Sequence, residues 1–331
     1  MDSDFLEKLH PRANYDLIGH NENINFILNS FKRNRLHQAY LLSGSEGVGK
    51  ATFAYSFARF LLSASSSNFI CDKNHKVCKL IESNTHPDLL VIEPNLDKKD
   101  RFISAKQIRK CSEFFSHTPS MSKWRVCIID SIDFMEISTS NTILKVLEEP
   151  PSYCLFIIIA QKVDSVIETI QSRCVELKFK DIGDDILKNK LKLLKPEMLD
   201  LEIDNLISLS EGSIGKLNDL VEEDSLKIYK DLNNIIKEKG INSSIYNFSD
   251  FILKEDKGIN KFNFFIECII FKVNSLIKEF SKSSSNFVIN ECLDLRDKML
   301  ELIKQERLFK LNKRQTIINL IINLNKIVNL Q

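Results

Sequence analysis

Residues 41–52 read LLSGSEGVGKAT, and this stretch decides the fold of the first part of the chain. Gly44, Gly47 and Gly49 are followed directly by Lys50, in the G-x-x-x-x-G-K spacing of a phosphate-binding loop. Such glycines let backbone N–H groups close around a polyphosphate, and the lysine adds a positive charge at the outer phosphates. An apolar run precedes the loop and a helical pattern follows it, as the motif requires. We interpret the stretch as a nucleotide site, present or ancestral, with a chance glycine turn as the alternative.

The residue after the lysine departs from this motif. A Ser or Thr hydroxyl normally holds Mg²⁺ there, but this chain has Ala51. Thr52 comes one position later and therefore points elsewhere on a helix. We expect the loop to hold the phosphates of ATP or ADP while being poorly equipped for metal-assisted chemistry on them.

A second apolar strand ends in a carboxylate. The segment VCIIDSID occupies 126–133, and its Asp130 would orient Mg²⁺ beside a phosphate loop. Hydrolytic sites need Glu at the next position to activate the attacking water, but this chain has Ser131. The alternative is a buried strand that happens to end in Asp. Its place after the phosphate loop favours the nucleotide interpretation.

Composition excludes several classes of protein. A length of 331 residues suits two or three domains, and 43% apolar with 27% charged residues is ordinary for a globular protein. The balance of 46 basic against 45 acidic residues gives no overall attraction to nucleic acid or lipid, so any DNA contact must come from a local patch or from partners. The opening MDSDFLEKLH is too charged for a secretory signal, and no membrane-spanning apolar run occurs. The eight scattered cysteines indicate cytoplasmic thiols.

The first half of the chain alternates short apolar runs with helical patterns. This alternation predicts an α/β domain whose mostly parallel sheet is covered on both faces. The predicted strands are Ala39–Leu42, Leu89–Ile92, Arg125–Ile129, Leu155–Ile159 and Val175–Phe179, and the predicted helices include Ala51–Leu62, Ile103–Phe115 and Ser138–Glu149.

The second half has apolar residues at helical spacing, most clearly in Phe262–Phe280 and Gln315–Leu330, and predicts an all-α region. A charged stretch with helical patterning lies between the halves and indicates a small helical domain. We therefore predict three parts, with boundaries at 1–181, 182–222 and 223–331.

Two further motifs lie late in the α/β region. LEEPP at 147–151 ends a helix, because the double proline stops it. QSRC at 171–174 then precedes a strand. Arg173 is either an ordinary surface ion-pair former or an arginine finger, which enters a neighbouring subunit's nucleotide site and stabilises charge in the transition state.

These motifs together resemble the AAA+ clamp-loader subunits of bacterial DNA polymerase III. They occur in the family's order: SGSEGVGKAT at 43–52, THPDLL at 85–90, WRVCIID at 124–130, LKVLEEPP at 144–151 and SRC at 172–174. The resemblance covers about residues 1–220 motif by motif and the remainder by length and character, and it is greatest to the delta-prime type of subunit. It implies an AAA+ P-loop domain, a small helical lid and a helical collar that holds a pentamer together.

The departures from the family's motifs imply which type of subunit this is. Its hydrolytic motor subunits have Ser or Thr after the lysine, an Asp-Glu pair and an Arg in the lid. This chain has Ala51, Asp130–Ser131 and Gly215–Lys216. The resemblance thus implies a stator without its own ATPase or polymerase activity, which donates Arg173 to a neighbouring motor subunit.

The implied partners are the gamma/tau motor subunits and a delta subunit in a hetero-pentamer, with the sliding clamp and primed DNA reached through the complex and no membrane involved. The implied activity is loading of that clamp during replication. The alternative is a catalytically active AAA+ ATPase, such as a gamma/tau-like motor subunit.

The family's zinc module is incomplete in this chain. Members of the family carry four cysteines between the phosphate-loop helix and the HPD tripeptide, whereas this region reads CDKNHKVC at 71–78. Cys71, His75 and Cys78 are weak candidate ligands, and a structural zinc site wants four. We expect a metal-free remnant, with zinc as the alternative. His86–Asp88 should form a capped turn before a strand.

Overall fold

The computed structural model divides the chain into two compact units, Met1–Lys216 and Leu217–Gln331, and each is described by itself. It describes residues 10–63, 69–94, 102–135, 137–237, 243–254, 261–283 and 286–330. The charged opening residues 1–9, where we predict no secretory signal, lie outside the described residues. The predicted three-part division, with boundaries after 181 and 222, stays a prediction.

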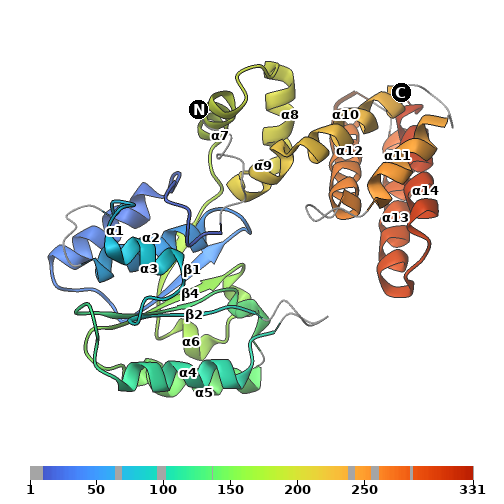
Figure 1. Ribbon diagram of the computed structural model, residues 1–331. Helices are drawn as coiled ribbons and strands as arrows, with labels where there is room; N and C mark the ends of the chain where they lie inside the picture. The colour runs from blue at the N-terminus through green and yellow to red at the C-terminus, as the bar shows by residue number, and fades with distance from the viewer. Residues whose placement is uncertain are drawn as a thin grey trace. The chain divides into compact units, whose positions relative to one another are not determined.

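The first unit is built on a five-stranded parallel sheet in the order β2-β3-β4-β1-β5 (Figure 1). The strands are β1 (Ala39–Gly44), β2 (Leu89–Ile92), β3 (Arg125–Ile129), β4 (Cys154–Ala160) and β5 (Val175–Phe179). All of the five predicted strands are confirmed. The near-continuous apolar runs of β1, β3 and β4 are buried, as expected for a parallel sheet with both faces covered.

Helices cover both faces of this sheet, with α1, α2 and α3 on one face and α4, α5 and α6 on the other (Figure 1). Their bounds are α1 (Asn21–Lys32), α2 (Lys50–Leu62), α3 (Lys76–Glu82), α4 (Ala105–Ser116), α5 (Ile137–Glu148) and α6 (Glu168–Gln171). Short 3₁₀ helices follow β3 and β4, at Ile132–Phe134 and Val163–Ser165. Two more helices of this unit follow β5, α7 (Asp184–Leu194) and α8 (Asp200–Ser210), and the boundary between the units falls within the next helix, α9 (Ile214–Val221).

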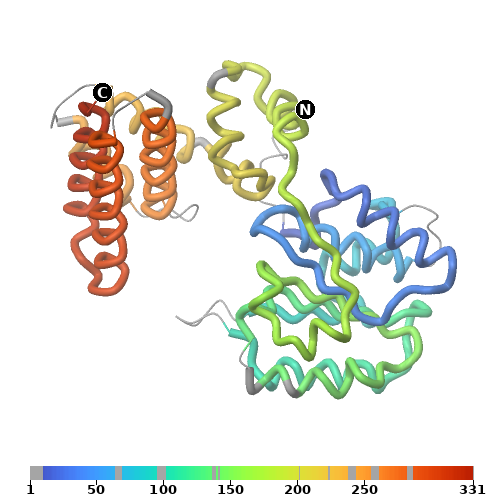
Figure 2. Tube along the Cα trace, turned by 180° about the vertical axis from the view of Figure 1, so that it is seen from behind, coloured from blue at the N-terminus to red at the C-terminus, as the bar shows by residue number. Residues whose placement is uncertain are grey.

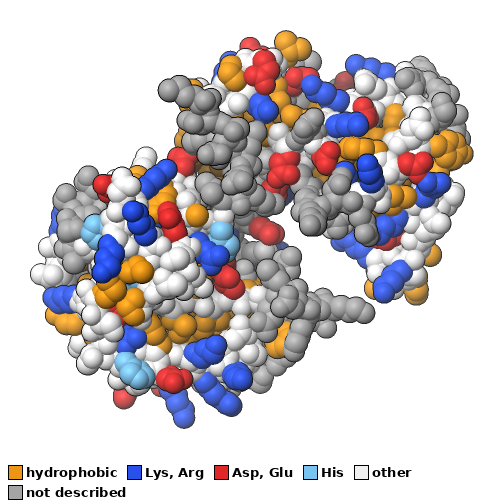
Figure 3. Space-filling view, viewed as in Figure 1, with side chains coloured by type: hydrophobic (Ala, Val, Ile, Leu, Met, Phe, Trp, Pro, Cys, Tyr) orange, Lys and Arg blue, Asp and Glu red, His pale blue; other side chains and the backbone are white. Residues whose placement is uncertain are grey.

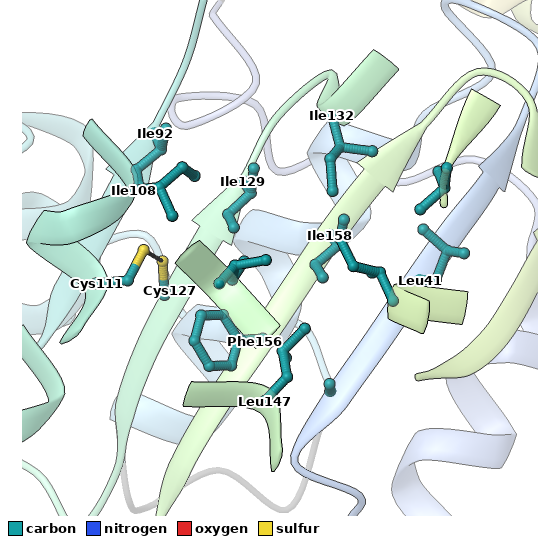
Figure 4. Packing of buried hydrophobic residues seen from close by; sticks show 14 of the residues in the cluster. Leu41, Ile92, Ile108, Cys111, Cys127, Ile129, Ile132, Leu147, Phe156 and Ile158 are labelled. Carbon is teal, nitrogen blue, oxygen red and sulfur yellow. Dashed lines mark hydrogen bonds between the residues drawn. The ribbon is translucent and has the colours of Figure 1, made fainter. Parts of the chain in front are cut away.

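The core of the first unit lies between the sheet and α4–α6. Phe156 and Ile158 of β4 lie beside Ile129 of β3, and Leu147 of α5 packs against them (Figure 4). Burying each side chain of this size contributes roughly 1.5–3 kcal/mol. The alternate residues of the strands face α2, where the Tyr40 and Phe57 rings meet edge to face with 5.6 Å between their centroids. The central strands β1, β3 and β4 are therefore covered on both faces, whereas β5 has exposed residues.

The second unit is all helical among its described residues, which confirms the predicted all-α region. It contains α10 (Glu223–Lys237), α11 (Ser243–Leu253), α12 (Lys261–Ser283), α13 (Asn286–Phe309) and α14 (Lys313–Val328). The last three pack side by side (Figure 2). Their fully buried residues include Phe265, Ile269, Ile317 and Leu320.

The face shown in Figure 3 carries side chains of both charges. Basic and acidic side chains are interspersed on the face shown in Figure 3, in keeping with the net charge of +1. Among the described residues, no helix combines the length and the apolar character that crossing a membrane requires.

The HPD tripeptide (His86–Asp88) directly precedes β2, an edge strand of the sheet, and fixes the chain there. Asp88 is fully buried, and its carboxylate accepts hydrogen bonds from the backbone N–H groups of Ser120, Met121 and Ser122 at 2.7, 2.8 and 3.1 Å. The imidazole of His86 accepts the backbone N–H of Asp88 at 3.1 Å. The tripeptide thus forms the expected turn before β2 and also holds the loop that leads into β3.

We expect Asp88→Asn to lower the free energy of unfolding by about 2–4 kcal/mol. The amide offers one acceptor where the carboxylate offers two, and its NH₂ group faces backbone donors. Urea denaturation measures the change, with Asp164→Asn as the exposed control expected within about 0.5 kcal/mol of the parent. Equal stability of the two variants would contradict this account of the loop.

Candidate functional site

The predicted phosphate loop lies at the carboxyl end of the sheet. It connects β1 to α2, and β1 lies between β4 and β5. The chain leaves β1 towards one face of the sheet and leaves β4 towards the other (Figure 1). Such a switch point leaves a crevice outside the carboxyl ends of the strands, where α/β proteins bind their ligands.

The three glycines of the loop adopt backbone conformations that other residues rarely adopt. Gly44, Gly47 and Gly49 have φ angles of 146°, 72° and 107°. A Cβ on Gly44 would lie 2.3 Å from the carbonyl oxygen of Phe179, at the end of β5. The first two glycines are therefore required by close backbone approach as well as by positive φ.

Lys50 begins α2 and is held inside the loop. Its Nζ donates hydrogen bonds to the carbonyl oxygens of Gly44 and Ser45 at 2.6 and 2.7 Å. Burial lowers the pKa of Lys50, and the nearby carboxylate of Asp130 acts in the opposite direction. An ammonium has three donors, so one N–H remains for a phosphate oxygen. The loop and its lysine therefore fit a bound polyphosphate.

The loop also contacts residues 212–215, which lead into and begin α9 and are called the closing turn here. The sequence did not predict this contact. The backbone N–H of Gly215 donates to the carbonyl oxygen of Gly47 at 2.9 Å, and the hydroxyl of Ser213 donates to the carbonyl oxygen of Glu46 at 3.0 Å. A Cβ on Gly47 would lie 2.4 Å from Ser213 Oγ. The segment at the predicted lid thus packs directly against the loop backbone.

The positions that would serve metal-assisted hydrolysis are incomplete. Ala51 lacks a hydroxyl, and Thr52 is buried on α2 with 8% of its surface exposed. Asp130 follows β3 and accepts a hydrogen bond from the Ser131 hydroxyl at 3.0 Å. Burial raises the pKa of Asp130, and the Ser131 hydrogen bond acts against that rise. The arrangement supplies one carboxylate for a metal ion and no carboxylate at 131 to activate water.

Two residues near the loop, Gln161 and Asp133, were not predicted from the sequence. The side chain of Gln161, just after β4, donates to the carboxylate of Glu46 at 3.3 Å. The carboxylate of Asp133 accepts the backbone N–H of Gln161 at 2.8 Å. Gln161 directly follows β4, and Asp133 lies in the 3₁₀ helix that follows β3. These positions were the available signal, because the carboxyl ends of parallel strands meet on one side of the sheet.

Arg173 is anchored by local contacts. Its Nη2 donates to Glu148 Oε1 at 2.6 Å, and its Nη1 donates to the carbonyl oxygen of Thr169 at 2.8 Å. An ion pair therefore joins the LEEPP and SRC motifs. Such an ion pair was one of the two alternatives that the sequence left open for Arg173. A role for this arginine at a neighbouring subunit stays a prediction.

The candidate zinc ligands do not converge on a common point. His75 caps α3, since its Nδ1 accepts the backbone N–H of Val77 at 3.3 Å. Cys71 and Cys78 are buried together beside the guanidinium of Arg59, and burial raises the pKa of Cys78 to about 12. A structural zinc site needs four ligands, so a metal-free segment stays the expectation here. Among the described residues, no cluster of three or more His, Cys, Asp or Glu has the geometry to hold a metal ion.

Comparison with known proteins adds a family context. The family described as DNA polymerase III, delta subunit, matches residues 19–183. The chain is similar to the DNA polymerase III subunit gamma of Buchnera aphidicola subsp. Schizaphis graminum, with 28% identity over 75% of this chain and 69% of that protein. It is 29% identical to the DNA polymerase III subunit delta' of Bacillus subtilis, over 71% of this chain and 68% of that protein.

Longer relatives are matched over a smaller share. The chain is 29% identical to the DNA polymerase III subunit tau/gamma of Haemophilus influenzae, over 64% of this chain and only 30% of that protein. Among solved structures, it is similar to a DNA polymerase III gamma subunit-related protein from Thermotoga maritima, with a TM-score of 0.47 and 16% identity over 90% of this chain and 98% of that chain.

We expect Gly215→Ala to separate the closing turn from the phosphate loop. The new Cβ would lie 2.9 Å from the Cα of Gly47, so backbone must move. Such overpacking lowers stability by about 1–3 kcal/mol. Hydrogen exchange at the Gly215 amide should also become faster. Gly183→Ala is the matched control, because a Cβ there meets nothing within 4 Å. Unchanged exchange in Gly215→Ala would contradict the contact.

For the zinc-module region we expect well under one equivalent of zinc by elemental analysis of the purified chain. A chelator should leave the melting temperature unchanged, because no metal-binding free energy is coupled to folding. Stoichiometric zinc that is lost in the Cys78→Ser variant would overturn this expectation.

Proposed function

The chain belongs to the clamp-loader family of DNA polymerase III, and we propose that it is a subunit of the delta-prime type, which does not hydrolyse ATP. The named relatives include both gamma and delta' subunits, so their names do not distinguish the two types. The choice rests on the chemistry of the site.

One observation carries the proposal: a well-formed phosphate loop stands beside positions that lack the groups needed for hydrolysis. Lys50 and the glycines fit phosphate, while Ala51 offers no hydroxyl for Mg²⁺ and Ser131 offers no carboxylate for water. Loss of a preorganised catalytic group typically lowers a rate by about 10²–10³-fold. Two such losses together place hydrolysis far below the rate of a motor subunit, whereas ATP or ADP could still be held.

The lid position supports the same conclusion. Where the resemblance implies an arginine in motor subunits, this chain has Gly215–Lys216. The Nζ of Lys216 lies 2.7 Å from a carboxylate oxygen of Glu211, on its own turn. The lysine is therefore engaged locally, and the neighbouring glycine packs on the loop backbone.

The place of Arg173 supports a role in a neighbouring subunit. It lies two residues before the start of β5, whereas the phosphate loop follows the end of β1. The register pairs Tyr40 with Val175 and Gly44 with Phe179. The two sites therefore lie at opposite ends of neighbouring parallel strands, about 15–20 Å apart along them. Arg173 cannot reach the chain's own phosphate loop, so an arginine finger here would act in trans.

We therefore propose a stator in a cytoplasmic hetero-pentamer with gamma/tau motor subunits and a delta subunit. The complex would load the sliding clamp onto primed DNA, and Arg173 would complete the ATP site of the adjacent motor subunit. In this proposal residues 182–222 form the lid, and the helices of residues 223–331 form the collar that joins the subunits.

We expect negligible ATP turnover by the isolated full-length chain. The rate should not fall further in Lys50→Ala, and a purified motor subunit serves as the positive control. A turnover on the order of 1 s⁻¹, in the range of active enzymes, that disappears in Lys50→Ala would instead identify the chain as a motor subunit.

A further inference from the structure

The last residue of α5 is bound to the proposed finger. Glu148 Oε1 lies 2.6 Å from Arg173 Nη2, and the side chains of the two residues are 49% and 33% exposed. We propose that Glu148 is the positioning residue for Arg173, which sets the direction in which the guanidinium faces a neighbouring subunit's nucleotide. This inference rests on the proposed role of Arg173 in trans.

The backbone on both sides of this pair is fixed by the core. Leu147 is 2% exposed and Ile170 is fully buried, and both belong to the cluster under α4–α6. The backbone N–H of Arg173 donates to the carbonyl oxygen of Ile170 at 3.1 Å. Pro150 prevents α5 from extending past Glu149. The carboxylate and the guanidinium therefore start from rigid points, and their ion pair orients the flexible end of the arginine.

The contacts of Arg173 leave it able to bind a further anion. A guanidinium has five N–H donors in a fixed planar fork. Thr169 O and Glu148 Oε1 each accept from a different terminal nitrogen, and the Ser172 hydroxyl lies 3.4 Å from Nη1. The Nε–H and the second N–H of Nη2 have no hydrogen-bond partner among the described residues. The Nε–H and one N–H of Nη2 thus stay available to donate to a phosphate oxygen.

Helix stability does not explain a glutamate at this position. A carboxylate at a helix C-terminus lies beside unpaired carbonyl groups, where negative charge is unfavourable. A half-exposed ion pair of this kind typically shifts an equilibrium by only about fivefold or less. Glu149, the next residue, is exposed and forms no ion pair among the described residues. Of the two adjacent glutamates, Glu148 contacts Arg173.

The test uses the complete loader assembled with this full-length chain, and measures kcat and KM of its ATPase in the presence of clamp and primed DNA. Arg173→Ala should lower kcat. Glu148→Ala should lower the Arg173-dependent part of kcat by about threefold to tenfold with little change in KM, since orientation matters in the transition state. Glu148→Gln should retain more activity than Glu148→Ala, because its amide oxygen still accepts from Nη2. Glu149→Ala is the matched control and should equal the parent.

The double variant Glu148→Ala/Arg173→Ala gives the readout that a merely structural role would not produce. If Glu148 acts through Arg173, the double variant should be no slower than Arg173→Ala alone. Two outcomes would overturn the positioning role and leave the proposed function intact. One is that the losses of the two single variants add in the double variant. The other is that the Glu148→Ala complex is as fast as the parent or faster while the Arg173→Ala complex is slow. If the Arg173→Ala complex kept full ATPase and clamp-loading activity, Arg173 would not act as an arginine finger. The positioning role of Glu148 would then be contradicted as well.

Discussion

The loop between β1 and α2 can follow its path only because Gly44 and Gly47 carry no Cβ. At Gly44 the backbone lies against Phe179 at the end of β5, and at Gly47 it lies against Ser213 in the closing turn. Sheet, loop and turn therefore meet within contact distance at one place. A side chain at either glycine would push the neighbouring segments apart.

The electrostatics of the site separate phosphate binding from hydrolysis. The charge of Lys50 is removed from water and compensated by two loop carbonyls and by the Asp130 carboxylate nearby. None of these groups needs a hydroxyl at 51 or a carboxylate at 131. A clamp-loader subunit can therefore keep the architecture of a nucleotide site after the groups for hydrolysis are gone. Arg173 lies at the other end of the strands from this site.

The local order of residues was sufficient to predict the elements of the fold. The five strands were predicted because each is a short apolar run bounded by turns or helical patterns, and α2 because the glycine loop and Lys50 mark its beginning. The all-α second unit was predicted from apolar residues at helical spacing. Helix bounds shifted by one or two residues, as at α4 and α5, because capping decides them: Ser104 and Gln107 form a capping box that sets the start of α4.

The sequence by itself therefore determined the class of fold, the phosphate loop and the missing groups at 51 and 131, since these depend on neighbours along the chain. Only the tertiary structure decided which distant residues meet. Ser213 bonds the backbone of Glu46, Asp88 holds the loop at 120–122, and Glu148 binds Arg173. No spacing rule predicts such pairs, because they form where separate elements converge on a common edge and where buried or half-buried charges and donors must find partners.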